Sequence, residues 1–124
     1  MKDIYGAEQP GMTVAPEQLH NQMVGCLVTG TSRALCEEVT FNAKRVTSLD
    51  WVSYHTLRFK DAPRTHVVSV DRNDLQPRGS GEPTIVPVGA AIANAVFDAT
   101  GVRIREAPMT PPRVRAYLKA AGVA

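Results

Sequence analysis

Residues 16–38, with the sequence PEQLHNQMVGCLVTGTSRALCEE, decide the fold. Pro16 suits the first turn of a helix, and the helix dipole favours Glu17 beside it. Small or apolar residues then recur on one face at helical spacing, namely Leu19, Met23, Cys26, Leu27, Gly30 and Ala34. The pattern predicts an amphipathic helix over 16–38 that buries this face.

Two glycines, Gly25 and Gly30, lie inside the predicted helix. Each costs a helix up to about 1 kcal/mol relative to alanine. Close packing of another backbone would offset this cost, because a glycine has no Cβ to keep a neighbour away. We therefore expect another segment to approach the helix closely at these positions.

Three further segments are predicted to be β-strands. Residues 41–57 are typical of two short strands, or of one strand with a bend near 42–44. Residues 65–71 alternate between two faces, as a half-buried strand does, and 102–107 alternate apolar with charged side chains. Residues 1–10 are polar and are expected to be extended or frayed.

Two more helices are predicted toward the C-terminus. Pro87 opens an alanine-rich helix over 87–99, and Gly101 is placed to end it. A last helix over 111–121 follows Thr110, which is a favourable N-cap residue. The predicted order is therefore α-β-β-β-α-β-α, which indicates an α+β fold with a small mixed sheet and about three helices.

Composition limits the size and the class of the protein. The chain has 124 residues, of which 44% are hydrophobic, and this predicts a single domain over 1–124. The net charge of +2 is too small to indicate a nucleic-acid partner. No apolar run approaches the ~18 residues of a membrane span, and the N-terminus lacks the apolar core of a signal peptide. We expect a cytoplasmic protein without a membrane partner.

The cysteine and histidine residues do not indicate a disulfide or a metal site. Cys26 and Cys36 would lie about 15 Å apart on one helix, whereas a disulfide needs Cα atoms within about 7 Å. Two reduced thiols fit the cytosol. The three histidines have no ligand spacing, so no metal ligand is predicted from this chain.

The loop over 78–83, RGSGEP, carries the strongest candidate for chemistry. Gly79 and Gly81 allow a tight turn and a close approach to a ligand. The carboxylate of Glu82 follows at once and could serve as a general base. The alternative is a surface turn with a solvated glutamate. No GK[ST] sequence follows, so the segment is not a phosphate-binding loop.

In three ordered segments the sequence resembles a known family. They are LHNQMVGCLVTGTSRALCEEVTF (19–41), RVTSLDWVSYHTLRFKDAP (45–63) and GSGEPTIVPVGAAIANAVFDATGVRIREAPMTPPRV (79–114). Together they resemble the C-terminal part of the molybdopterin-binding large subunit of molybdenum hydroxylases. This superfamily includes xanthine dehydrogenase and aldehyde oxidoreductase, and the isoquinoline oxidoreductase and nicotinate dehydrogenase types look most similar.

The resemblance implies roles for four residues. Glu82 matches the glutamate of the family's Gly-x-Gly-Glu motif, which implies that it is the catalytic general base. Gln22 matches a helix glutamine that contacts the pterin, and its amide offers both a donor and an acceptor. Gly79 and Gly81 match glycines that let the loop approach the cofactor. The implied reaction hydroxylates an N-heterocycle or an aldehyde with oxygen derived from water.

The sequence also departs from the family pattern. Thr29 stands where a second glutamine is usual, and Ala15 where an asparagine is usual. The family's large subunit is several times longer, so the chain matches only its last portion. The resemblance therefore implies molybdopterin in a full complex with the rest of the subunit and an iron–sulfur subunit. In the isolated chain we expect no cofactor.

Two interpretations of function remain open from the sequence. In the first, the chain is an oxidoreductase piece that is completed by another chain. In the second, it is a stand-alone, non-catalytic domain that keeps the fold, binds no cofactor and self-associates. The intact GSGEP and NQMVG segments favour the first, whereas Thr29 and the missing N-terminal motif of the family favour the second. In either case we expect a homo-oligomer when the chain is alone.

Overall fold

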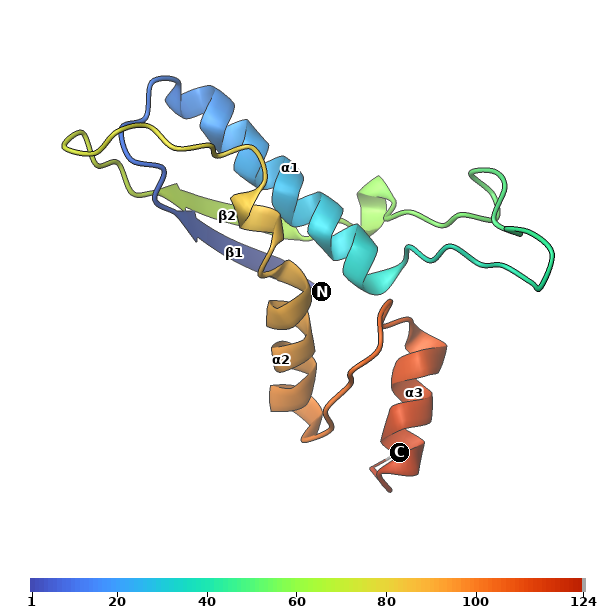
Figure 1. Cartoon of the computed structure of the whole chain (residues 1–124). Helices are drawn as coiled ribbons and strands as arrows, with labels where there is room; N and C mark the ends of the chain where they lie inside the picture. Colours follow the sequence, from blue (N-terminus) through green and yellow to red (C-terminus); the bar gives the residue numbers. More distant parts are fainter. Residues whose placement is uncertain (124) are drawn as a thin grey trace. The chain divides into compact units, whose positions relative to one another are not determined.

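The structure, a computed structural model, describes residues 1–123, which form three α-helices and a two-stranded sheet (Figure 1). The order is β1, α1, β2, α2, α3, with 3-10 turns at Phe59–Asp61 and Pro83–Ile85. The predicted α+β class is confirmed. The chain forms two compact units, the first of Met1–Gly30 and Arg58–Val88 and the second of Thr31–Leu57 and the chain from Gly89 onward.

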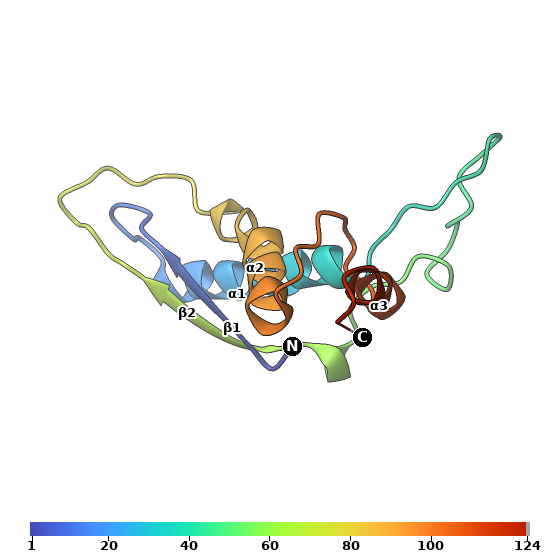
Figure 2. The same ribbon diagram turned by 90° about the horizontal axis from the view of Figure 1, so that it is seen from below.

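The sheet belongs to the first unit. Its two strands are parallel, whereas the sequence predicted a mixed sheet. β1 (Asp3–Glu8) pairs with β2 (Arg64–Ser69) along their full length (Figures 1 and 2). Parallel neighbours need a long crossover connection, and α1 (Pro16–Leu35) is part of it. β1 was not predicted as a strand; Ile4 is its one buried side chain, so its alternation is weak.

The buried face of α1 is the predicted one. Met23 and Leu27 are 1% and 2% exposed, and Cys26 is buried beside them. At Gly30 an added Cβ would stand 2.8 Å from the Cβ of Val88, so the close approach expected at this glycine is present, made by a side chain. At Gly25 no described atom would lie within 4 Å of an added Cβ, so the same explanation is wrong there.

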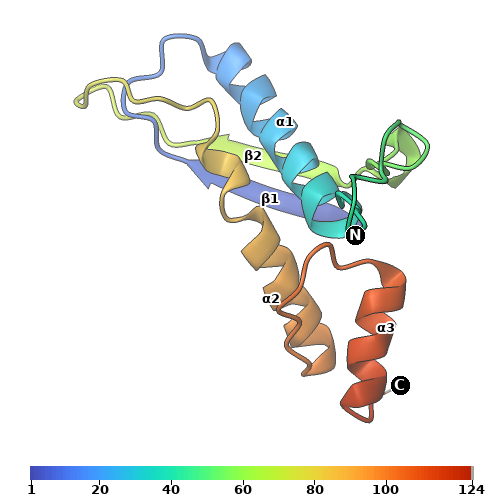
Figure 3. The same cartoon turned by 45° about the vertical axis from the view of Figure 1, so that its right-hand side comes forward.

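The second unit has its own small core of Ala34, Ile92, Ile104 and Met109. The backbone N–H of Met109 donates to the carbonyl of Ala34 over 2.7 Å. α2 (Val88–Thr100) and α3 (Pro111–Ala120) match the two predicted C-terminal helices to within about a residue (Figure 3). Gly101 ends α2 with a φ of +71°, which favours glycine.

Two of the predicted strands are wrong. Over 41–57 the structure has a single antiparallel bridge between Phe41 and Val46. The Asn42 carboxamide oxygen accepts hydrogen bonds from the backbone N–H groups of Lys44 and Arg45. Such hydrogen bonds from a side chain to nearby backbone compete with the hydrogen bonds of a strand ladder. Here they are formed in place of a strand.

The segment over 102–107 is also not a strand. The N–H of Val102 is bonded to the Thr100 hydroxyl, and the Arg103 guanidinium lies 4.1 Å from the centre of the Phe97 ring. Alternation alone does not make a strand, because its backbone groups need a partner strand. The element order is therefore β-α-β-α-α. The first helix ends at Leu35 rather than at residue 38.

Over residues 1–123, no helix combines the length and the apolarity needed to cross a membrane. The same residues hold no cluster of three or more His, Cys, Asp or Glu side chains suited to a metal ion. Cys26 and Cys36 are not in disulfides, as the sequence predicted.

The packing at Gly30 predicts opposite outcomes for two equivalent substitutions in α1. Gly30→Ala pushes a methyl group into the stiff side chain of Val88. We expect it to lower the free energy of unfolding by about 1–2 kcal/mol net of the helix propensity that alanine adds. Gly25→Ala enters open space and should raise the same free energy by up to about 1 kcal/mol. Urea denaturation at one protein concentration measures both, and equal stability of the two variants would contradict the packing argument.

Candidate functional site

The structure joins two predicted site residues directly. Gln22 lies on α1, and its side-chain Nε2 donates a hydrogen bond to the carbonyl oxygen of Gly81 over 2.8 Å. The two residues are 59 positions apart in sequence. The bond uses one N–H of the amide, which leaves a second N–H and the carbonyl oxygen as hydrogen-bonding groups.

A second side chain of α1 reaches the same carbonyl oxygen. The thiol of Cys26, one helical turn after Gln22, lies 3.2 Å from the oxygen of Gly81 and donates to it. Side chains four positions apart share a helix face, which is why both reach one atom. A carbonyl oxygen has two lone pairs, so two donors satisfy it fully.

Further contacts anchor the loop on either side of Gly81. Upstream, the N–H of Arg78 donates to the carbonyl of Pro10 over 2.8 Å. Downstream, the buried hydroxyl of Thr84 donates to the carboxylate of Glu8 at the end of β1. The segment between Arg78 and Thr84 therefore spans two fixed points, and α1 holds it in the middle.

Glu82 follows the held carbonyl and has an exposed side chain. It precedes the 3-10 turn Pro83–Ile85, in which the N–H of Ile85 donates to the Glu82 carbonyl over 3.0 Å. Around Gly79 and Gly81 the described residues leave open space, with no atom within 4 Å of where a Cβ would stand. The site therefore consists of an anchored backbone, an exposed carboxylate and a loop surface that a large ligand can approach.

A hollow of about 210 Å³ opens beside this loop, between residues 10–15, Leu19 and residues 77–80. Its lining includes Arg78, Ser80 and Thr13. The Thr13 hydroxyl oxygen is buried and has no hydrogen-bond partner among residues 1–123. A buried, unsatisfied hydroxyl costs about 1–3 kcal/mol, and this oxygen is covered by the protein rather than open to the hollow. Ala15, one of the departures from the family pattern, also lines the hollow.

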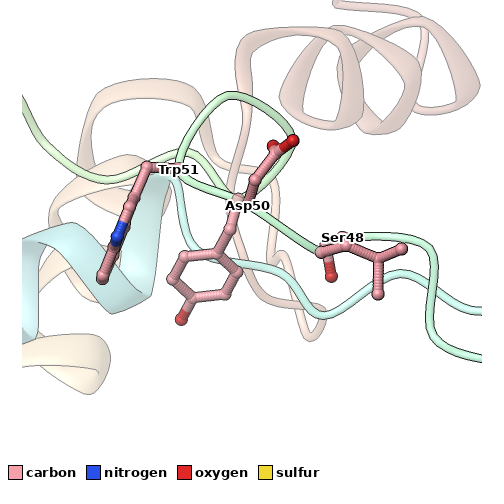
Figure 4. A pocket seen from close by; sticks show the side chains of 5 residues that line it. Ser48, Asp50 and Trp51 are labelled. Atoms are coloured by element: carbon pink, nitrogen blue, oxygen red, sulfur yellow. The ribbon is translucent and has the colours of Figure 1, made fainter.

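A second hollow, of about 310 Å³, lies in the second unit and is formed by one loop (Figure 4). Ser48, Asp50 and Trp51 line it, and Trp51 is 76% exposed. Hydrogen bonds from Ser53 and from the backbone N–H of Val52 lower the pKa of Asp50. The carboxylate of Asp50 therefore accepts hydrogen bonds from within its own turn.

A charged cluster occupies the start of the sheet. Asp3 on β1 pairs with Arg64 over 2.9 Å, and His66 Nε2 lies 3.0 Å from the same carboxylate. The hydrogen bond from Arg64, followed by that from His66, lowers the pKa of Asp3. The His66 ring also stacks on Tyr5, with 4.5 Å between the ring centres. These contacts join the two strands and account for the polar groups there.

The sequence predicted Gln22, Gly79, Gly81 and Glu82 as site residues, and the structure places all four at one loop and the helix face beside it. Cys26 was not among the predicted site residues. One signal was available, since Cys26 follows Gln22 by four positions on the predicted helix. Helical spacing places the two side chains together but does not show which backbone atom they meet.

Comparison with known proteins shows similarity to parts of much larger enzymes. No family model matches the chain. It is 46% identical over 112 residues to a nicotinate dehydrogenase subunit of Pseudomonas putida, covering 90% of this chain and 9% of that protein. It is 32% identical over 107 residues to the aldehyde oxidoreductase molybdenum-binding subunit of Escherichia coli, covering 81% and 15%.

A solved structure shares the fold. The crystal structure of quinoline 2-oxidoreductase from Pseudomonas putida 86 matches with a TM-score of 0.84 at 20% identity, over 95% of this chain and 16% of that one. The chain therefore spans less than a fifth of the length of these relatives. Its sequence is similar to one segment of each of these two subunits, and its fold is similar to one segment of the solved structure.

Proposed function

We propose that the chain supplies the C-terminal portion of a molybdopterin-binding subunit. Completed by the remaining part of that subunit, it serves an oxidoreductase that hydroxylates an N-heterocycle or an aldehyde with oxygen derived from water. The observation that carries the proposal is the hydrogen bond from Gln22 to Gly81, because it unites the two sequence motifs at one place. The similarity to the nicotinate dehydrogenase subunit supports the substrate class.

The residues around the loop suit a large polar cofactor. Open space at Gly79 and Gly81 lets a planar ring system approach the backbone. The remaining N–H and oxygen of Gln22 can pair with the edge of a pterin. We infer that Gln22, Gly79 and Gly81 lie on the cofactor side.

In this proposal Glu82 is the general base. Molybdopterin would hold the molybdenum that serves as the redox centre for oxidation of the substrate. The carboxylate of Glu82 accepts the proton of the water-derived oxygen that adds to an electron-poor carbon of the substrate. The exposed side chain is free to reach outward from the anchored backbone, while the Gly81–Glu82 peptide stays in place. An iron–sulfur subunit is the partner that would pass the electrons on, in the cytoplasm.

The surface of α2 supports association with other protein. Its small residues Gly89, Ala90, Ala91, Ala95 and Ala99 are exposed. Small side chains allow close approach of another backbone, and uncovered apolar surface tends to pair. In a complete subunit this face would meet the rest of that subunit. Alone, it would pair with a second copy of the chain, which is the self-association that the non-catalytic interpretation also requires.

Replacing the proposed base tests the catalytic role. In a reconstituted complex that turns over, we expect Glu82→Gln to lower kcat by about 10²–10⁴-fold, because the amide keeps the volume but accepts no proton. The melting temperature should stay nearly unchanged, since the side chain is exposed. Glu17→Gln, at another exposed glutamate, is the matched control and should keep full turnover. Full turnover of Glu82→Gln would exclude Glu82 as the base.

The isolated chain should carry no molybdenum. Its proposed cofactor contacts come from one loop and one helix face, a small share of what a large cofactor needs. We expect elemental analysis of the purified chain to find no stoichiometric molybdenum and its visible spectrum to be featureless. Stoichiometric metal in the lone chain would show that it holds the cofactor without a partner.

The isolated chain should also self-associate through α2. We expect light scattering to give at least a dimer at high concentration. Ala91→Glu places a charge on the small-residue face and should shift the equilibrium toward the monomer. Ala116→Glu places the same charge on an exposed position of α3 and serves as the control. A clean monomer of the unmodified chain would contradict this prediction.

A further inference from the structure

The loop that carries Glu82 has little backbone stiffness of its own. Gly79 and Gly81 flank Ser80, and glycine loses more backbone freedom on ordering than any other residue. The Ser80 hydroxyl donates to the Arg78 carbonyl over 3.3 Å, a contact within the loop itself. A fixed position for Glu82 therefore depends on contacts from outside the loop.

Between the anchors at Arg78 and Thr84, two outside contacts converge on one atom. Gln22 Nε2 lies 2.8 Å and Cys26 Sγ 3.2 Å from the carbonyl oxygen of Gly81. That carbonyl belongs to the planar peptide that joins Gly81 to Glu82. Two donors from one helix restrain both the position of this oxygen and the tilt of the peptide plane. The plane in turn sets where the Cα of Glu82 stands.

We propose that Gln22 and Cys26 are positioning residues, and that their paired hydrogen bonds to Gly81, the α1 clamp, hold the Glu82 backbone in place. Cys26 is buried beside Met23, so its sulfur has little freedom to move. Gln22 is exposed and its amide reaches both the loop and the surface. The existence of the α1 clamp is independent of the proposed function, whereas its value for catalysis rests on that function.

Limited proteolysis of the whole chain tests the α1 clamp without any cofactor. Trypsin cuts after Arg78, at the edge of the glycine loop, and the rate follows the population of the opened loop. One hydrogen bond is worth roughly a factor of 2 to 12 in such an equilibrium. We expect Gln22→Ala and Cys26→Ala each to speed cleavage after Arg78 by that factor. Cleavage after Arg45, in the second unit, should not change and is the internal standard.

Two variants separate the clamp from a general loss of structure. Gln18→Ala changes an exposed glutamine one turn earlier on α1 and should leave cleavage after Arg78 unchanged. Cys26→Ser keeps a hydrogen-bond donor at this position. We therefore expect trypsin to cleave Cys26→Ser after Arg78 more slowly than it cleaves Cys26→Ala, although serine is the more polar residue in a buried place. Equal rates for Gln22→Ala and Gln18→Ala, or for serine and alanine at Cys26, would overturn the proposal.

Turnover in a reconstituted complex separates this proposal from the function on which it draws. Displacing a catalytic group by about 1 Å can cost on the order of 10²-fold. We expect Cys26→Ala to lower kcat and Cys26→Ser to recover it, with KM less affected. If the variants of Gln22 and Cys26 are cleaved faster after Arg78 but keep their kcat, the α1 clamp is confirmed and Glu82 is not the base. If cleavage is unchanged in Gln22→Ala, the α1 clamp fails whatever the turnover shows.

Discussion

Burial of one face of α1 is the constraint on which the first unit depends. Met23 and Leu27 are almost fully buried on this face, and Gly30 brings Val88 within contact of the helix backbone. Side chains of this size contribute about 1.5–3 kcal/mol each when fully buried. The same face meets β1, where an added Cβ on Gly6 would stand 3.2 Å from Leu27. The helix therefore sets where the sheet and the loop before Pro83–Ile85 can lie.

The packing of α1 determines the geometry of the candidate site. Gln22 and Cys26 flank the buried Met23, so the residues that hold the loop are next to the residue that holds the helix. Because α1 is fixed by apolar contacts, its polar donors meet Gly81 without an ordering cost of their own backbone. The stability of the first unit thus depends on the apolar side chains of α1, and the geometry of the site depends on the donors Gln22 and Cys26 beside them.

The sequence predicted those parts of the structure whose signals are local. The helical stripe from Leu19 to Ala34 and the stop at Gly101 were confirmed, because periodicity and capping act within a few residues. Strands failed because pairing is decided elsewhere in the chain. β1 was missed, since β2 supplies its hydrogen bonds from about half the chain away, and 102–107 alternates without a partner.

For the site, the family resemblance named the residues, but it did not predict how they contact one another. Gln22 and the loop at 79–82 were named from the sequence, and the structure brings them together. The thiol contact of Cys26 depends on which carbonyl the loop turns inward, a tertiary detail that no local pattern encodes. The exposed state of Trp51, in a loop closed by Asp50, likewise follows from side-chain to backbone bonds rather than from strand propensity.

The parallel pairing of β1 with β2 has a consequence for the folding pathway. Asp3 pairs with Arg64 and Glu8 with Ser69, so each contact closes a loop of about sixty residues. Closing a long loop costs chain entropy before the contacts that it allows can stabilise the chain. Proteins with many distant contacts therefore fold more slowly. α1 can form early from local contacts, whereas the sheet must wait until both strands have met. β1 therefore joins late, and chains interrupted before that step present β2 with an unpaired edge.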